Sequence, residues 1–292
     1  MFEGAHTALV TPFNNNRFDE AAFERLIEFQ IENGISGIVP VGTTGESPTL
    51  DHEEHARVVE LAVKHAKGRC KVIAGTGSNS TAEAISLTVE AEKAGADAAL
   101  LVSPYYNKPS QEGLFRHYKA IAEATKLPLV LYSIPGRAGI EIGVSTVRRL
   151  AEACPNIVAI KEAGGSVDRV SQLRQALPAS FEIVSGDDAL TLPFMAAGAC
   201  GVISVASNII PAEVSALVCA ALSGDFAKAR AQHEHWYPLF RDLFVETNPV
   251  PIKTALAWQG RIAQEFRLPL CEMTEENAAK LRATATALKL IS

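Results

Sequence analysis

The sequence lacks an excess of basic charge and lacks a long uninterrupted apolar run. Its 27 Lys and Arg residues are outnumbered by 33 Asp and Glu residues, which gives a formal net charge of -6. The basic residues are scattered and leave no positive surface for a phosphate backbone. The most apolar stretch, residues 193–211, is broken by glycine, serine and asparagine, which would be costly in lipid. We therefore expect no nucleic-acid partner and no membrane span.

Disulfide and metal-binding patterns are also missing. The five cysteines never form a C-x-x-C pair, so we expect reduced thiols that act as small packing residues, at Cys70, Cys154, Cys200, Cys219 and Cys271. His52-Glu-Glu-His55 does not match H-E-x-x-H, and His233 and His235 lack a third ligand, so no metal site is expected. The first residues carry no basic segment followed by an apolar one. We expect no secretory signal and a cytoplasmic location.

Short apolar, β-branched runs alternate with amphipathic stretches along most of the chain. This pattern is typical of strand–helix units joined into a parallel sheet. Eight such units in about 210 residues match the size of a closed barrel, so the sequence predicts an α/β fold, a (β/α)8 TIM barrel. An open, doubly wound sheet is the alternative, but no G-x-G-x-x-G follows the first strand. The predicted strands are residues 6–10, 37–41, 71–74, 98–102, 129–132, 157–161, 181–185 and 201–205.

Helix signals separate these strands and then continue without them. Asp19, Asp51, Thr81 and Ser110 stand where a helix start needs an acceptor for its free N–H groups. After the last strand the pattern is helical throughout, over residues 211–222, 226–247, 251–259 and 274–288. We therefore divide the chain into a barrel, residues 1–210, and a C-terminal helical extension, residues 211–292. The apolar faces of the extension should cover the barrel or a neighbouring subunit.

A barrel of this kind gathers its reactive groups at the carboxyl ends of its strands. Lys161 closes the apolar run of residues 156–160, so its stem should be buried and its amine should reach the barrel mouth. Desolvation disfavours the ammonium form, and a neutral amine can attack a ketone. The alternative is a structural lysine paired with a carboxylate such as Glu162.

Other strand ends carry phenols, hydroxyls and one arginine. Tyr106 and Tyr132 could relay protons through Thr43, or could be rim aromatics whose hydroxyls lie in water. The turn at residues 42–46, Gly-Thr-Thr-Gly-Glu, allows close backbone approach and suits a small carboxylate, although it lacks the lysine of a Walker loop. Arg137 is either a forked donor for a second carboxylate or a solvated loop residue.

Six motifs occur in order along residues 3–290, and together they resemble those of the 4-hydroxy-tetrahydrodipicolinate synthase family. Any one of them is weakly specific, but six in order with matching spacing make coincidence implausible. They are Gly42-Thr-Thr-Gly-Glu46, Tyr105-Tyr-Asn107, Tyr132 with Pro135-Gly-Arg137, Lys161-Glu-Ala163, Ser185-Gly-Asp-Asp188 and Asn248-Pro-Val-Pro-Ile-Lys253. The family commonly has Asn where this chain has Ser133.

The resemblance implies a lyase that condenses pyruvate with L-aspartate 4-semialdehyde in the diaminopimelate route to lysine, without a metal or an organic cofactor. It implies an imine between Lys161 and pyruvate, and a proton relay of Tyr132, Thr43 and Tyr106. Tyr106 would enter from a neighbouring subunit of a homotetramer built as a dimer of dimers. Thr44 would hold the pyruvate carboxylate, and the remaining substrate contacts would come from Arg137, Gly186 and Ile203.

Feedback inhibition by L-lysine is also implied. In lysine-sensitive members of the family the effector binds at a subunit interface, and the matching positions here are Ser47, His52, His55, Asn79, Glu83 and Tyr105. Two other functions stay open. One is a different Schiff-base pyruvate aldolase of the same superfamily, such as an N-acetylneuraminate or 2-keto-3-deoxy sugar acid lyase. The other is a barrel that only binds a small acid, because fold alone does not fix function.

Overall fold

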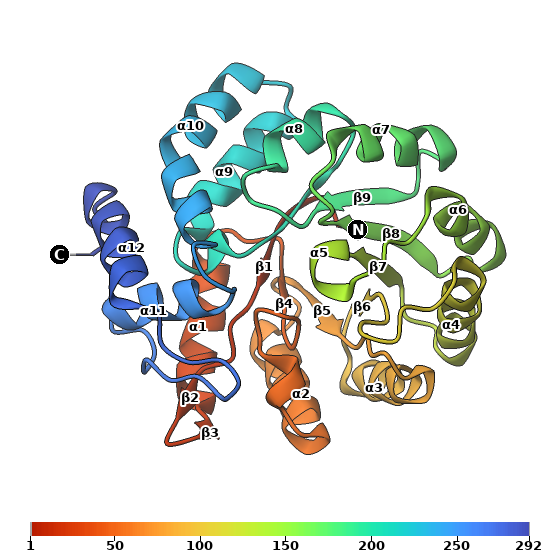
Figure 1. Cartoon of the computed structure of the whole chain (residues 1–292), viewed down its shortest axis with the longest axis horizontal. Coiled ribbons are helices and arrows are strands. Elements are labelled where there is room, and N and C mark those ends of the chain that lie inside the picture. Colours follow the sequence, from red (N-terminus) through yellow and green to blue (C-terminus); the bar gives the residue numbers. More distant parts are fainter. Residues whose placement is uncertain (1, 292) are drawn as a thin grey trace.

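The computed structural model describes residues 2–291, and its centre is a closed barrel of parallel strands (Figure 1). The strand order around the barrel is β1-β10-β9-β8-β7-β6-β5-β4, which confirms the predicted TIM barrel. All eight predicted strands are present, and their ends match the prediction to within two residues. They are β1 (Gly4–Ala8), β4 (Gly37–Val39), β5 (Lys71–Gly75), β6 (Ala98–Val102), β7 (Leu129–Ser133), β8 (Ile157–Glu162), β9 (Glu182–Ser185) and β10 (Gly201–Ser204).

Side chains alternate between the inside of the barrel and the layer beneath the helices, as the two-residue period of a strand requires. Along β8, Ala159 belongs to the apolar cluster that fills the barrel, and Ile160 belongs to the larger core outside it. Lys161 therefore faces inward and Glu162 outward. Phe2 joins the inner cluster and is 1% exposed.

The barrel helices begin where capping side chains were predicted, with one correction. Asp19, Asp51 and Ser110 each accept a backbone N–H at a helix start, but the third helix is capped by Ser80, not by Thr81. Ser80 takes that place because its hydroxyl accepts the Glu83 N–H. The helices that follow the strands are α1 (Glu20–Glu32), α2 (His52–Ala66), α3 (Thr81–Ala94), α4 (Gln111–Ala124), α6 (Val144–Ala153), α7 (Val167–Ala176), α8 (Thr191–Ala196) and α9 (Pro211–Leu222).

Short elements absent from the sequence prediction occupy the loops. A hairpin of β2 (Phe13–Asn14) and β3 (Arg17–Phe18) turns at Asn15 and Asn16, whose positive φ angles of 52° and 58° are those of a tight hairpin turn. The mouth of the barrel carries α5 (Pro135–Ala138) and two short 3-10 helices, η1 (Ser47–Thr49) and η2 (Ala206–Asn208).

The C-terminal helices are α10 (Phe226–Asp242), α11 (Val250–Trp258) and α12 (Glu275–Ala287), and α12 packs against α10 and α11 (Figure 1). The prediction that the helix beginning at residue 226, α10, extends to residue 247 is wrong. The helix ends at Asp242, and the following turn brings Phe244 and Asn248 to the barrel mouth. Helix α9 packs on β1 and η2. The division at residue 210 stays a prediction.

The cysteines are only partly packing residues. Cys70 and Cys154 are buried and Cys200 is half-buried, but Cys219 and Cys271 are exposed, so the packing prediction is wrong for these two. Both lie on the outer surface of the C-terminal region, where no core surrounds them. None of the helices described between residues 2 and 291 combines the length and apolarity that crossing a membrane requires.

Candidate active site

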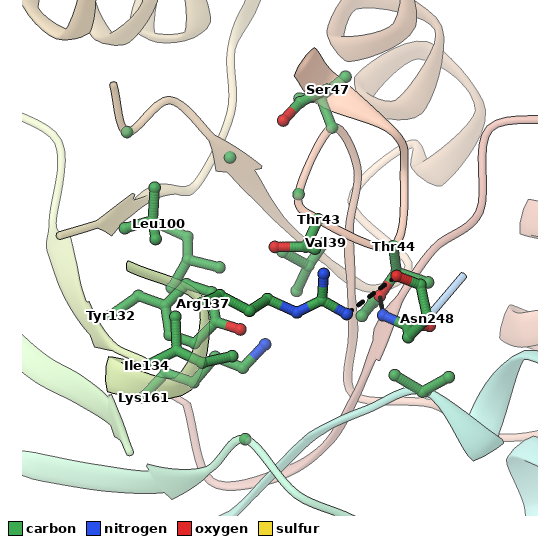
Figure 2. A pocket seen from close by; sticks show the side chains of 18 of the residues that line it. Val39, Thr43, Thr44, Ser47, Leu100, Tyr132, Ile134, Arg137, Lys161 and Asn248 are labelled. Atoms are coloured by element: carbon green, nitrogen blue, oxygen red, sulfur yellow. Dashed lines mark hydrogen bonds between the residues drawn. The ribbon is translucent and has the colours of Figure 1, made fainter. Parts of the chain in front are cut away.

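A cavity of about 80 Å³ opens at the carboxyl ends of the barrel strands, where the reactive residues were expected. Six of the eight residues predicted for catalysis or substrate binding line it: Thr43, Thr44, Tyr132, Arg137, Lys161 and Gly186. Figure 2 shows Lys161, Tyr132 and Thr43 around one space, with the Arg137 guanidinium extending toward Thr44 and Asn248.

Lys161 ends as a buried amine inside the barrel. Its neighbour across the sheet is Tyr132, and Nζ lies 4.2 Å from the centre of the Tyr132 ring. Burial lowers the pKa of Lys161 to about 7, with Asp188 acting to raise it and Arg137 to lower it further. A large part of the population is therefore the neutral amine at neutral pH, which is the form able to attack a carbonyl carbon.

The alternative pairing of Lys161 with Glu162 is wrong. Glu162 points out of the barrel because neighbouring residues on a strand face opposite sides. Its Oε2 lies 2.7 Å from Arg169 Nε in a pair of buried side chains. Asp188, rather than Glu162, is the carboxylate that acts electrostatically on Lys161, and it is fixed by the N–H groups of Val205 and Ala206.

The two predicted relay tyrosines have opposite environments. Tyr132 is 6% exposed, and burial raises its pKa to about 12, with Arg137 and a hydrogen bond with Thr43 acting to lower it. Tyr132 is thus a protonated donor and not a rim aromatic. Tyr106 is 90% exposed, has a φ of 74° and does not line the cavity. A single chain therefore brings Tyr132 and Thr43 together but leaves Tyr106 outside the site.

The predicted carboxylate-binding turn has an unusual backbone. Val41 and Glu46, which flank Gly42-Thr-Thr-Gly45, have positive φ angles of 50° and 52°. Gly75 allows this path, because a Cβ there would lie 2.5 Å from Val41 O. Within residues 2–291, the N–H groups of Thr43 and Thr44 have no hydrogen-bond acceptor. Two free donors beside two hydroxyls suit a small carboxylate.

Of the three other residues predicted to contact the substrate, two line the cavity and one does not. Gly186 lies against Lys161, since a Cβ there would be 2.9 Å from Lys161 Cε. Arg137 Nη2 donates to the carbonyl of Asn248 at 3.0 Å, so it is a fixed donor at the cavity wall and not a freely solvated residue. Ile203 is 1% exposed within the barrel and does not line the cavity. Its role in substrate binding stays a prediction.

Sequence reasoning assigned no role to Asn248 or Phe244, which also line the cavity. Asn248 Nδ2 donates to Thr44 Oγ1 at 2.9 Å, as the dashed line in Figure 2 marks. The motif at residues 248–253 was the available signal for Asn248. Phe244 gave none, since its position depends on where α10 ends.

A second cavity, of about 380 Å³, adjoins the first and shares Thr43, Ser47 and Arg137 with it. Five of the six predicted lysine-site residues line it: Ser47, His52, His55, Glu83 and Tyr105. The sixth, Asn79, is not part of the wall but donates to Tyr105 O at 3.2 Å. Hydrogen bonds from Ser78 and His52 hold the pKa of Glu83 below its usual range, which makes it an anionic wall.

The described part of the chain contains no cluster of three His, Cys, Asp or Glu side chains able to hold a metal ion. The functional groups that line the mouth include an amine, a phenol, hydroxyls and an arginine. Such a set can form an imine and move the accompanying protons.

Comparison with known proteins decides the family. A family model described as the dihydrodipicolinate synthetase family matches residues 1–288. The chain belongs to this family. A 4-hydroxy-tetrahydrodipicolinate synthase of Aquifex aeolicus (strain VF5) is 54% identical over 97% of this chain and 96% of its own length. The synthase structure from Methylacidiphilum fumariolicum SolV is 60% identical, with a TM-score of 0.98 over 99% of this chain and 96% of that chain.

Further solved members of the family carry ligands or a different assembly. The chloride-inhibited Acinetobacter baumannii synthase is complexed with pyruvate (46% identity, TM-score 0.97, all of both chains covered). The Cyanidioschyzon merolae synthase has lysine bound; its sequence identity is 43% and its TM-score is 0.97, with 99% of both chains covered. Another structure is described as the first monomeric dihydrodipicolinate synthase variant. Its sequence identity is 41% and its TM-score is 0.97, with 99% of this chain and 98% of that chain covered. As a member of this family, the chain is a lyase with the synthase activity of lysine biosynthesis.

The reactivity of the Lys161 amine toward a carbonyl compound should depend on pH. Because the pKa of Lys161 is about 7, the reactive neutral fraction grows as pH rises through 7. We expect kcat/KM to rise across this range and then level off, since the Tyr132 phenol stays protonated until about pH 12. Steady-state rates between pH 5.5 and 9 measure this. A rise that continues steeply to pH 9, as for a lysine with an ordinary pKa, would contradict the assignment.

Proposed function

We propose that this enzyme condenses pyruvate with L-aspartate 4-semialdehyde through a Schiff base on Lys161, to give 4-hydroxy-tetrahydrodipicolinate. The observation that carries the proposal is the buried Lys161 amine, with a pKa near 7, in a cavity walled by Tyr132 and by the turn that carries Thr43 and Thr44. The pyruvate complex of the A. baumannii relative supports the choice of the first substrate. We place the reaction in the cytoplasm, where its pathway operates.

The first half of the reaction uses the amine and the proton relay. Lys161 Nζ attacks the keto carbon of pyruvate, and the resulting carbinolamine loses its hydroxyl as water. Nitrogen must give up a proton and the departing oxygen must gain one, and Tyr132 with Thr43 provides that path. Loss of a proton from the methyl group of the imine then gives an enamine.

The second half joins the two substrates and frees the enzyme. The enamine carbon adds to the aldehyde carbon, and the aldehyde oxygen takes up a proton to become a hydroxyl. The amino group of the substrate attacks the imine carbon and closes the ring, and the bond to Lys161 Nζ breaks. Every atom is supplied by the two substrates, and one water leaves. Neither a metal nor an organic cofactor takes part.

The substrate carboxylates would bind at two separate donors. The free N–H groups of Thr43 and Thr44, with the Thr44 hydroxyl, suit the pyruvate carboxylate. Arg137 suits the carboxylate of the semialdehyde, because a guanidinium binds a carboxylate through two parallel hydrogen bonds. Gly186 and Ile203 would add backbone carbonyls.

We propose that Tyr106 completes the relay from a neighbouring subunit, in a homotetramer that is a dimer of dimers. Its exposed ring and its absence from the cavity of its own chain support this arrangement. A monomeric family variant exists, so assembly has to be measured for this chain. Analytical ultracentrifugation together with activity at matched dilutions would do so.

Borohydride trapping tests the proposed function directly. Reduction in the presence of pyruvate should add one covalent adduct, located by peptide mapping at Lys161, and pyruvate omitted from the mixture is the control. The alternative within the superfamily is tested by substrate choice. The synthase should consume aspartate semialdehyde with pyruvate and leave N-acetylneuraminate and 2-keto-3-deoxygluconate nearly untouched; the reverse preference would assign a sugar-acid lyase.

We also propose feedback inhibition by L-lysine bound in the second cavity, with support from the lysine complex of the C. merolae relative. Glu83→Gln should raise the lysine concentration for half-inhibition at least about tenfold, because an ammonium loses a charged hydrogen-bond partner. Inhibition curves of both proteins measure the ratio. Glu90→Gln on the same helix, which lines a separate groove outside this cavity, is the matched control. Equal inhibition of all three proteins, or none at millimolar lysine, would refute the site.

A further inference from the structure

A buried ion pair lies directly beneath the Thr43–Thr44 turn. Lys253 Nζ, on α11, donates to Glu46 Oε1 at the end of the turn, and both side chains have no solvent exposure. The aromatic rings of Phe13 and Phe266 enclose the ammonium, at 4.4 and 5.3 Å from Nζ. The second carboxylate oxygen of Glu46 accepts the backbone N–H of Arg267 at 3.3 Å.

The turn held by this pair has a conformation that needs outside support. Val41 is β-branched and Glu46 is bulky, yet both have positive φ. Residues in such conformations persist only where their surroundings over-determine them. Thr11 supports the turn through a 2.6 Å hydrogen bond to Gly45 O, and Asn248 through its bond to Thr44. The two groups that donate hydrogen bonds to the Glu46 carboxylate, Lys253 Nζ and the Arg267 N–H, both belong to the C-terminal extension.

Stability alone does not explain a charged pair at this position. Removing two charges from water offsets much of their mutual attraction, and replacing such pairs with apolar residues is often neutral. Burial lowers the pKa of Lys253 although Glu46 acts to raise it, so desolvation outweighs the attraction here. What an ion pair supplies and an apolar contact does not is a fixed direction between two atoms.

We propose that Glu46 and Lys253 are positioning residues for pyruvate: the pair clamps the turn so that the Thr43 and Thr44 donors face the substrate carboxylate. The proposal rests on the proposed function, since it assigns pyruvate to this turn. Through Lys253, the C-terminal extension thus contributes to the pyruvate site, although neither Glu46 nor Lys253 contacts the substrate.

The double variant Glu46→Gln/Lys253→Met tests the clamp without leaving a buried charge unpaired. The pyruvate concentration for half-maximal borohydride trapping should rise at least about tenfold, because a displacement of about 1 Å in a positioned group costs on the order of 10²-fold. The KM of the semialdehyde should change much less, since Arg137 lies on a different loop. A purely structural role would not produce this split between the two substrates.

Two further variants keep the outcome decisive. Glu46→Asp retains both charges but withdraws the carboxylate by one methylene, and it should shift pyruvate trapping in the same direction even if the double variant fails to fold. Asp242→Asn removes a buried carboxylate from the same extension, where it bonds Thr284 and Arg241. It should lower the melting temperature and leave the pyruvate dependence of trapping at the wild-type value.

The possible results separate the clamp from the proposed function. If Glu46→Asp and the folded double variant trap pyruvate at wild-type concentrations, with or without a lower melting temperature, the clamp is overturned. If both substrates are weakened equally in these variants, the pair is a structural feature only and the clamp is again overturned. If the wild-type protein forms no adduct with pyruvate, the proposed function itself fails.

Discussion

Lys161→Met is expected to lower turnover by about 10³-fold or more and at the same time to stabilise the fold. Loss of the nucleophile removes the covalent route, and single removals of this kind cost on the order of 10³ to 10⁶ in kcat. The stability gain follows from the pKa of Lys161, about 7 in the folded chain against 10.5 for an ordinary lysine. One pKa unit corresponds to about 1.4 kcal/mol, so removing the buried amine should add a few kcal/mol at neutral pH.

The stability gain has a defined pH dependence. Between pH 7 and 10.5 the unfolded chain binds a proton that the folded chain does not, so wild-type stability increases with pH across this window. The advantage of Lys161→Met should therefore be largest at pH 7 and below, and should fade toward pH 10.5. Urea unfolding at three pH values measures it. Lys228→Met, at an exposed position of α10, is the control and should change neither activity nor stability.

An inactive but less stable Lys161→Met protein would leave the loss of activity open to a trivial explanation by misfolding. A variant that retains turnover, or that is still labelled by borohydride and pyruvate, would remove Lys161 from the mechanism. The proposed chemistry would then have no nucleophile, because the other buried lysine within residues 2–291, Lys253, is enclosed by Glu46 and two aromatic rings.

Tyr132→Phe should lower kcat by about 10²- to 10⁴-fold, the usual contribution of a positioned proton donor. The ring beside Lys161 is kept, so the loss reports the phenol hydroxyl alone. Burial keeps that hydroxyl protonated, with a pKa of about 12, until well above physiological pH. When the enzyme and pyruvate are mixed and borohydride is added after successive delays, the variant should accumulate the pyruvate adduct more slowly than the wild type. The final amount of adduct should be the same.

Tyr118→Phe is the matched control for Tyr132→Phe. Tyr118 is also buried, but it lies on α4 and its hydroxyl has no hydrogen-bond partner in the described part of the chain. Removing an unsatisfied buried hydroxyl should be neutral or stabilising, and kcat should stay at the wild-type value. Equal losses in the two variants would show that the Tyr132 effect is general damage to the core and not the loss of a relay.

The sequence by itself determined the barrel and most of the site. Apolar runs and their spacing located every strand of the barrel, because burial on both faces leaves a continuous hydrophobic signal. Capping residues marked helix starts to within one residue, as the correction from Thr81 to Ser80 illustrates. Lys161 could be identified because it ends an apolar strand, and the ordered motifs around it pointed to the family.

Only the tertiary structure decided how these residues are paired and charged. The register of β8 turned Lys161 toward Tyr132 and Glu162 toward Arg169, and burial then set the pKa of Lys161. The clamp joins Lys253 to Glu46 across 207 residues of sequence. Such pairings depend on which distant segments meet and on how much water they exclude, and neither quantity is written in the local pattern of a sequence.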